Sequence, residues 1–85
     1  MPYTVKLERP AQRSLDRLHG ATFNRIVSAL QSLVNEPRPP GVKKLQGNTN
    51  LYRIRVGDWR IVYTIGDREL LVLVVRIANR RDAYR

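Results

Sequence analysis

Arginines at a two-residue spacing are the residues of this sequence best suited to chemistry. Arg53 and Arg55 are separated by one residue, and Arg60 follows the Gly57-Asp58 pair. If Gly57-Asp58 is a two-residue hairpin turn, Arg55 faces Arg60 and the three arginines share one sheet face. We call it the arginine face and expect its side chains to be exposed.

Like charges opposite each other destabilise a strand pair, whereas a bound phosphate attracts both. This pattern favours an anion site, and the alternative is a strand face whose guanidinium groups are simply solvated.

The charge of the whole chain points to the same kind of ligand. Its 85 residues include 16 Lys and Arg against seven Asp and Glu, which gives a net charge of +9. Most of the basic residues are arginine, whose planar, permanently charged group suits phosphate. Such a balance indicates a polyanionic partner, most simply a nucleic acid, with an acidic protein as the second option.

The N-terminal half is predicted to form a strand and two helices. Residues 3–7 alternate in polarity, as in a short strand. Apolar residues at helical spacing predict a helix that begins at Pro10 and stops at Gly20. A second helix is expected to begin after Thr22, a good N-cap residue, and to extend to Asn35.

The C-terminal half is predicted to form three strands separated by two glycine-containing turns. These segments span residues 51–56, 59–65 and 70–77. Alternation along the last segment adds four apolar side chains to the arginine face: Leu71, Leu73, Val75 and Ile77. The order β-α-α-β-β-β predicts an α+β fold over residues 1–85, a single domain with two N-terminal helices packed on one face of a small, mainly antiparallel sheet.

Composition excludes several classes of protein. The chain has no cysteine and one histidine, His19, so a metal site or a metal cofactor is not expected. His19 lies beside Gly20, where we expect it to cap the first helix, and no pair of carboxylates is placed for acid–base catalysis. The longest apolar run, residues 70–75, is too short for a membrane helix, and the N-terminal residues lack the apolar stretch that is typical of a signal peptide. These features indicate a cytoplasmic protein.

Two segments carry a resemblance to a known family. The stretches LYRIRVGDWRIVYTI and VVRIANRRDAYR, together with the helical pair and KKLQGN, resemble the RelE/ParE toxin superfamily over essentially the whole chain. The resemblance implies the toxin of a toxin–antitoxin pair, with an acidic antitoxin protein as partner. Its fold, a small twisted sheet with two N-terminal helices, agrees with the predicted order. Toxins of the RelE branch cleave mRNA in the ribosomal A site, whereas those of the ParE branch inhibit DNA gyrase.

The resemblance also implies which residues form the site. The catalytic positions of the family fall on Arg53, Arg55, Arg60, Arg80 and Tyr84. Arg81 is the second choice for the position given to Arg80, because the spacing to the tyrosine varies. Residues expected to bind RNA are Lys43, Lys44, Arg81 and Arg85.

This sequence departs from the best-known RelE pattern, which has lysines at the positions of Arg53 and Arg55. Arginine keeps its proton at any working pH, so these residues can hold a phosphate but cannot act as the general base. The base is then Tyr84 as a phenolate, Lys43, Lys44, or no residue at all. Tyr84 has an alternative role as a platform on which an RNA base stacks.

Together these features predict a metal-independent endoribonuclease. The 2′-OH of the RNA would attack the adjacent phosphate, and the ribosome would position the mRNA. Arg9, Arg13 and Arg17 form a basic stripe on the first helix that could contact ribosomal RNA. Two alternatives from other classes remain, a gyrase-inhibiting toxin that is not an enzyme and a plain RNA-binding module.

Overall fold

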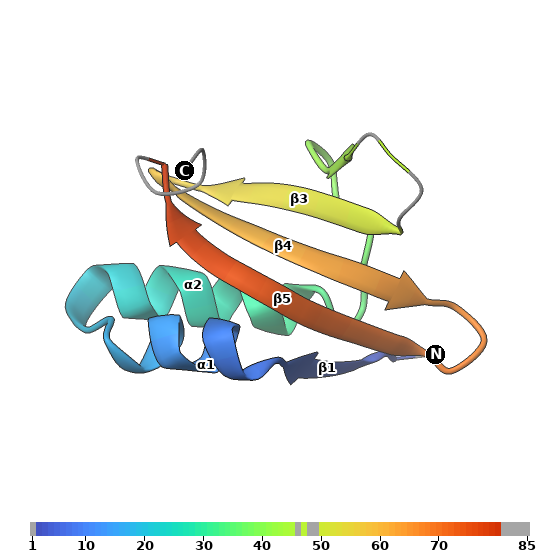
Figure 1. Cartoon of the computed structure of the whole chain (residues 1–85), viewed down its shortest axis with the longest axis horizontal. Coiled ribbons are helices and arrows are strands. Elements are labelled where there is room, and N and C mark those ends of the chain that lie inside the picture. Colours follow the sequence, from blue (N-terminus) through green and yellow to red (C-terminus); the bar gives the residue numbers. More distant parts are fainter. Residues whose placement is uncertain (1, 46, 48–49, 81–85) are drawn as a thin grey trace.

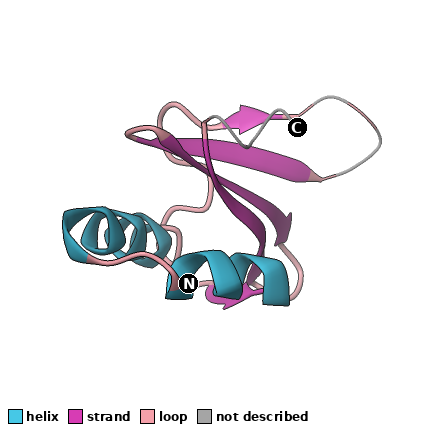
Figure 2. Ribbon diagram, turned by 60° about the vertical axis from the view of Figure 1, so that its left-hand side comes forward, coloured by secondary structure: helices cyan, strands magenta, loops and turns pink. Residues whose placement is uncertain are grey.

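Two helices cover one face of a five-stranded sheet in the computed structural model of the chain (Figures 1 and 2). The structure describes residues 2–45, 47 and 50–80. Its elements in chain order are β1 (Thr4–Leu7), α1 (Arg9–Asp16), α2 (Gly20–Ser32), β2 (Lys43–Lys44), β3 (Leu51–Val56), β4 (Trp59–Gly66) and β5 (Leu71–Asn79). The predicted α+β fold and the order of its elements are confirmed, with one further short strand, β2.

The strands lie in the order β1-β5-β4-β3-β2. β1 pairs with β5 in parallel, and the other three pairings are antiparallel, so the sheet is mainly antiparallel as expected. Strand β4 is therefore central, with β3 on one side and β5 on the other. The described residues place both helices on the same side of this sheet (Figure 2).

The boundary between the two helices differs from the prediction. α1 ends at Asp16, and α2 begins at Gly20 rather than after Thr22. Gly20 has a φ of +67°, a left-handed conformation that glycine adopts without a steric penalty, and this allows the chain to turn into α2. His19 is extended and occupies the N-cap position of α2, so the expectation that it caps the first helix is wrong.

The register of the β3–β4 hairpin is confirmed. Arg55 pairs with Arg60 and Tyr52 with Tyr63, and Gly57 provides the left-handed turn residue with a φ of +61°. One face of this hairpin packs toward the helices, and its buried side chains are those of Tyr52, Ile54, Ile61, Tyr63 and Ile65. The opposite face is the arginine face.

A β-bulge changes the predicted alternation of β5. Val62 of β4 pairs with Arg76, and the next residue, Tyr63, pairs with Val74, so Val75 is an extra residue. Beyond the bulge the two faces exchange, and Ile77 is buried on the helix side at 2% exposure. The prediction that Ile77 lies on the arginine face is therefore wrong. Strict alternation would expose Ile77 and bury the guanidinium of Arg76 in the core, a costly arrangement that the bulge avoids.

The core lies between the helices and the sheet. α2 contributes Ile26 and Leu30, and α1 contributes Ala11, to one cluster with the buried residues of β3, β4 and β5. Each large side chain that is fully buried contributes about 1.5–3 kcal/mol relative to an exposed one, so the sheet is a firm support for the residues on its other face. Neither helix of the described residues is long and apolar enough to cross a membrane.

Candidate functional site

Three arginines surround Val62 on the arginine face. Val62 pairs with Arg53 of β3 on one side and with Arg76 of β5 on the other. Adjacent strands are about 4.8 Å apart, so the Cα atoms of Arg53 and Arg76 are separated by about 10 Å. Arg60 lies two residues from Val62 along β4, about 7 Å away. We call these three residues the arginine cluster, and their long side chains can converge on one small anion.

The arginine cluster forms part of the wall of a cavity of about 470 Å³. The described residues that line it are Leu45, Leu51, Arg53, Arg60, Val62, Val75, Arg76 and Ala78. Five of these eight are apolar, three are arginine, and none is acidic. A cavity of this size and composition is typical of a site for a small ligand or for part of a larger one. Its cationic wall selects an anion, and its apolar residues can contact a flat, uncharged group.

Arg60 is buried, although the strand pattern predicts exposed side chains on this face. Its residue exposure is 6%, and it is the one charged residue in the buried set of the described chain. The physical reason is its place on the central strand, where Arg55 pairs with it from one side and Ala78 from the other. A guanidinium with little access to water interacts more strongly with a bound anion than an exposed one does.

The other predicted site residues are divided between the two sides of the sheet. Arg55 is exposed and lies opposite Arg60, but it does not line the cavity. Lys43 pairs with Arg53 and so belongs to the arginine face. Lys44 pairs with Tyr52, and its Nζ lies 5.9 Å from the centre of the Tyr52 ring. Because Tyr52 is buried toward the helices, Lys44 is separated from the arginine cluster.

Arg80 is held beside the β3–β4 turn. Its backbone N–H donates a hydrogen bond of 2.6 Å to the carbonyl oxygen of Asp58. This contact places Arg80 at the end of the sheet where Arg55 and Arg60 pair. The remaining predicted residues of the C-terminus, Arg81, Tyr84 and Arg85, lie outside the described residues.

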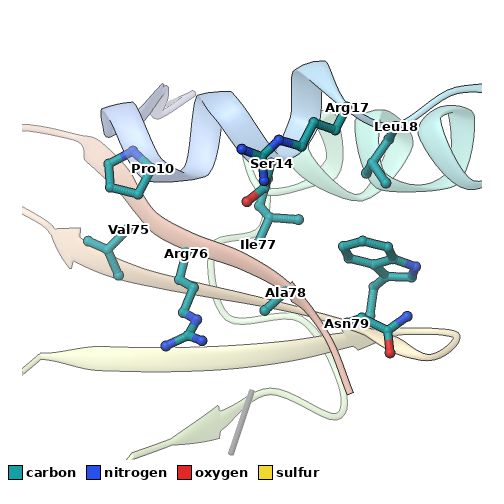
Figure 3. Close-up of a pocket in the computed structure, with 10 residues that line it drawn as sticks. Pro10, Ser14, Arg17, Leu18, Val75, Arg76, Ile77, Ala78 and Asn79 are labelled. Atoms are coloured by element: carbon teal, nitrogen blue, oxygen red, sulfur yellow. The ribbon is translucent and has the colours of Figure 1, made fainter. Parts of the chain in front are cut away.

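Arg76 is the member of the cluster that the sequence pattern does not predict. It lies within an apolar segment, where strict alternation assigns it to the helix side. The signal that could have revealed it is the pair Arg76-Ile77, because a charged residue followed by a large apolar one reverses the expected pattern of the strand. Figure 3 shows the Arg76 side chain directed away from α1, although Arg76 is also among the residues that line a second cavity, of about 530 Å³, between α1 and β5.

A second polar cluster lies at the opposite end of β4. Arg38 donates hydrogen bonds of 3.2 and 3.0 Å to the two carboxylate oxygens of Asp67, and the Tyr3 hydroxyl donates one of 2.7 Å. The hydrogen bonds from Arg38 and Tyr3 hold the pKa of Asp67 below its ordinary value. The same carboxylate raises the pKa of Tyr3 through its hydrogen bond. We call Arg38, Asp67 and Tyr3 the carboxylate cluster.

A buried tyrosine fixes the loop that carries Arg38. The Tyr63 hydroxyl donates a hydrogen bond of 2.7 Å to the carbonyl oxygen of Pro37. Burial raises the pKa of Tyr63 to about 12, so this hydroxyl remains a donor at neutral pH. The described residues contain no group of three or more His, Asp or Glu placed to hold a metal ion.

Comparison with known proteins identifies the family. The family model described as the ParE toxin of the type II toxin–antitoxin system parDE matches residues 5–84. Toxin RelG of Mycobacterium tuberculosis is 31% identical over 86 residues, which cover 100% of this chain and 99% of that protein.

Solved structures agree with the family and with the fold. The archaeal RelE–RelB complex of Pyrococcus horikoshii matches with a TM-score of 0.83 and 30% identity, covering 98% of this chain and 100% of that one. The toxin–antitoxin complex RelBE2 of Mycobacterium tuberculosis matches with a TM-score of 0.82 and 28% identity, covering 94% and 100%. The chain belongs to the RelE/ParE superfamily, the toxins of type II toxin–antitoxin systems.

Proposed function

We propose that this toxin is an endoribonuclease that cleaves mRNA on the ribosome and so inhibits translation in the cytoplasm. The observation that carries the proposal is the placement of Arg53 and Arg60 on one face, in the wall of a cavity with no acidic lining residue among those described. A phosphodiester is the anion that such a site fits best, because a guanidinium can donate two parallel hydrogen bonds to phosphate oxygens. The similarity to RelG and to other RelE toxins supports the RelE branch.

The reaction uses a nucleophile supplied by the RNA. The 2′-oxygen forms a bond to the adjacent phosphorus, the bond from phosphorus to the 5′-oxygen breaks, and the products are a 2′,3′-cyclic phosphate and a 5′-hydroxyl. Arg53 and Arg60 hold the non-bridging oxygens as negative charge develops on them. A positioned donor of this kind contributes about 2.7–4 kcal/mol to the transition state. The step requires no metal and no cofactor.

Proton transfer is the part of the mechanism that arginine cannot perform. Lys43, which pairs with Arg53, is one candidate for it, and Tyr84, from the C-terminal segment, is the other. Lys44, on the other side of the sheet, is too poorly placed to reach the same phosphate. Without a well-aligned acid–base pair, the isolated toxin cleaves RNA slowly, and the ribosome holds the mRNA in the geometry that cleavage requires.

Two macromolecular contacts follow from the charge distribution. Arg9, Arg13 and Arg17 are exposed along α1 and provide a basic surface for ribosomal RNA. The basic surface favours an acidic antitoxin, and the solved RelE–RelB and RelBE2 complexes support an antitoxin as partner. Leu71 and Leu73 extend the arginine face with apolar surface that an amphipathic antitoxin segment can cover. Such a complex associates more slowly as the salt concentration rises.

Primer extension on mRNA after induced expression of the toxin tests the proposal. We expect cuts in phase with codons, and RNA 3′ ends that carry a cyclic phosphate. Inhibition of gyrase supercoiling by purified toxin, without mRNA cuts, would instead identify a ParE-type inhibitor. RNA binding without cuts on translated mRNA would identify a plain RNA-binding module.

A further inference from the structure

We infer that Arg76 is a third phosphate-binding residue of the candidate site, placed there by the β-bulge at Val75. The inference rests on the proposed function, because it assigns Arg76 to the same RNA phosphate as Arg53 and Arg60. None of the positions that the family resemblance assigns falls on Arg76. The assignment comes from the strand register, the lining of the cavity and the direction of the side chain.

The register shows that the bulge determines the face on which Arg76 lies. Before the bulge, Val74 pairs with Tyr63 on the helix side. Without an extra residue, Arg76 would follow Val74 onto that side at a spacing of two. With Val75 inserted, Arg76 pairs with Val62 on the arginine face instead. A bulge that redirects one side chain in this way is common next to functional sites.

The geometry gives Arg76 a distinct direction of approach. Arg53 and Arg76 lie on opposite sides of Val62, and Arg60 lies on the same strand as Val62. An anion above Val62 is therefore contacted from three directions, by β3, β4 and β5. During in-line attack, negative charge develops on the phosphate oxygens, and three guanidinium groups can stabilise it from three directions. Arg53 and Arg60 alone would stabilise this charge only from the side of β3 and β4.

The three arginines also differ in solvent exposure. Arg60 is buried at 6% exposure, Arg53 is half-buried, and Arg76 is exposed. Arg60 thus offers a donor that is shielded from water, whereas Arg76 offers one on the solvent-exposed side of the same cavity lining. Arg76 lines the cavity of the arginine face, and its side chain is directed away from α1 (Figure 3).

The test compares Arg76→Ala with Arg68→Ala in the full-length toxin. Arg68 lies in the exposed turn between β4 and β5, so its loss changes the net charge equally but removes nothing from the cavity. Two measurements are made: binding of an RNA trinucleotide blocked by 2′-O-methyl groups to free toxin, and single-turnover cleavage of ribosome-bound mRNA. Urea melts of both variants check folding, and Arg76→Gln, which keeps much of the stem, replaces Arg76→Ala if that variant is unstable.

We expect Arg76→Ala to weaken trinucleotide binding and to slow cleavage by about tenfold or more, as for a charged hydrogen bond. The slope of log K against log salt should fall by about one. Arg68→Ala should change both by less than about twofold, because it removes only distant, screened charge. Equal effects of the two substitutions on binding and cleavage would overturn the inference. Wild-type binding that depends on Arg76, in a toxin that cuts no mRNA, would support the inference while overturning the proposed reaction.

Discussion

Arg38 and Arg60 lie near opposite ends of strand β4, and their neighbours carry opposite charges. Arg38 donates to both carboxylate oxygens of Asp67 and lies 5.2 Å from the centre of the Tyr52 ring. Arg60 lies between Arg55 and Ala78, in a cavity wall with two further arginines. The carboxylate cluster thus pairs opposite charges, whereas the described residues that line the cavity of the arginine cluster include three arginines and no acidic residue.

From this difference we infer which arginine is structural and which receives the proposed phosphate ligand. The Arg38–Asp67 pair joins the loop after α2 to the β4–β5 turn, which are distant in the sequence. The Arg55–Arg60 pair costs a few tenths to about 1 kcal/mol in repulsion, a cost that a bound phosphate reverses. Under the proposed function, the charge of its neighbours indicates whether an arginine is structural or receives a ligand. Each prediction below tests one side of this comparison.

The largest effect is expected at the buried member of the arginine cluster. Arg60→Lys should slow single-turnover cleavage of ribosome-bound mRNA about 100-fold, because lysine keeps the charge but not the fork of donors. Arg60→Ala should lose at least as much activity and also stability, since the Arg60 stem is buried. Urea melts separate the two effects. A lysine variant that cleaves at the wild-type rate would remove Arg60 from the site.

Tyr84 should give the next largest effect, and two substitutions distinguish its roles. If its ring stacks on an RNA base, Tyr84→Ala should raise the free-energy barrier of cleavage by about 1–3 kcal/mol, and Tyr84→Phe should cleave at close to the wild-type rate. We expect this result. If the hydroxyl is the general base, both variants should be equally impaired, and the wild-type rate should rise with pH until the phenol ionises. An alanine variant with the wild-type rate would contradict both roles.

On the structural side, Tyr63→Phe should lower stability without lowering activity. The substitution removes the hydrogen bond to the Pro37 carbonyl and leaves that oxygen without this donor, which costs about 1–2 kcal/mol in urea melts. Because the pKa of Tyr63 is raised from 10.0 to about 12, the folded state loses stability as the pH rises through that interval. Tyr63→Phe should remove this alkaline component, and an unchanged alkaline profile would contradict the assignment.

The smallest effect is expected from Asp67→Asn in the carboxylate cluster. The pKa of Asp67 is lowered in the folded state, so its contribution to stability is complete above its ordinary pKa and is lost as the pH falls through the folded value. The urea midpoint of wild type should therefore exceed that of the variant at neutral pH, and the two should converge in acid. A difference that persists at the lowest pH would show that the ion pair is not its source.

The β3–β4 hairpin was the most predictable part of the site. Gly57-Asp58 allows only a tight turn, and a tight turn fixes the register of both strands, so the placement of Arg53, Arg55 and Arg60 on one face follows from spacing alone. β5 was less predictable because it is apolar on both sides. In such a segment several registers bury similar surface, and only the partner strand determines where the bulge lies.

Two other features were absent from the sequence pattern for physical reasons. β2 consists of Lys43 and Lys44 alone, too short for any period to appear, and it forms because β3 offers a free edge beside it. The pairing of Arg38 with Asp67 joins residues 29 positions apart, which no local rule connects. Long-range polar contacts of this kind depend on the complete topology.

The most direct test of the comparison measures cleavage and stability for Arg53→Ala and Arg38→Ala side by side. Each variant loses one arginine from one cluster, and single-turnover cleavage of ribosome-bound mRNA is expressed per folded molecule, with the folded fraction taken from urea melts. We predict that Arg53→Ala loses about 100-fold in rate with an unchanged urea midpoint, and that Arg38→Ala keeps its rate with a lowered midpoint. Equal loss of rate in both variants, or a wild-type rate for Arg53→Ala, would contradict the assignment of the arginine cluster to the phosphate.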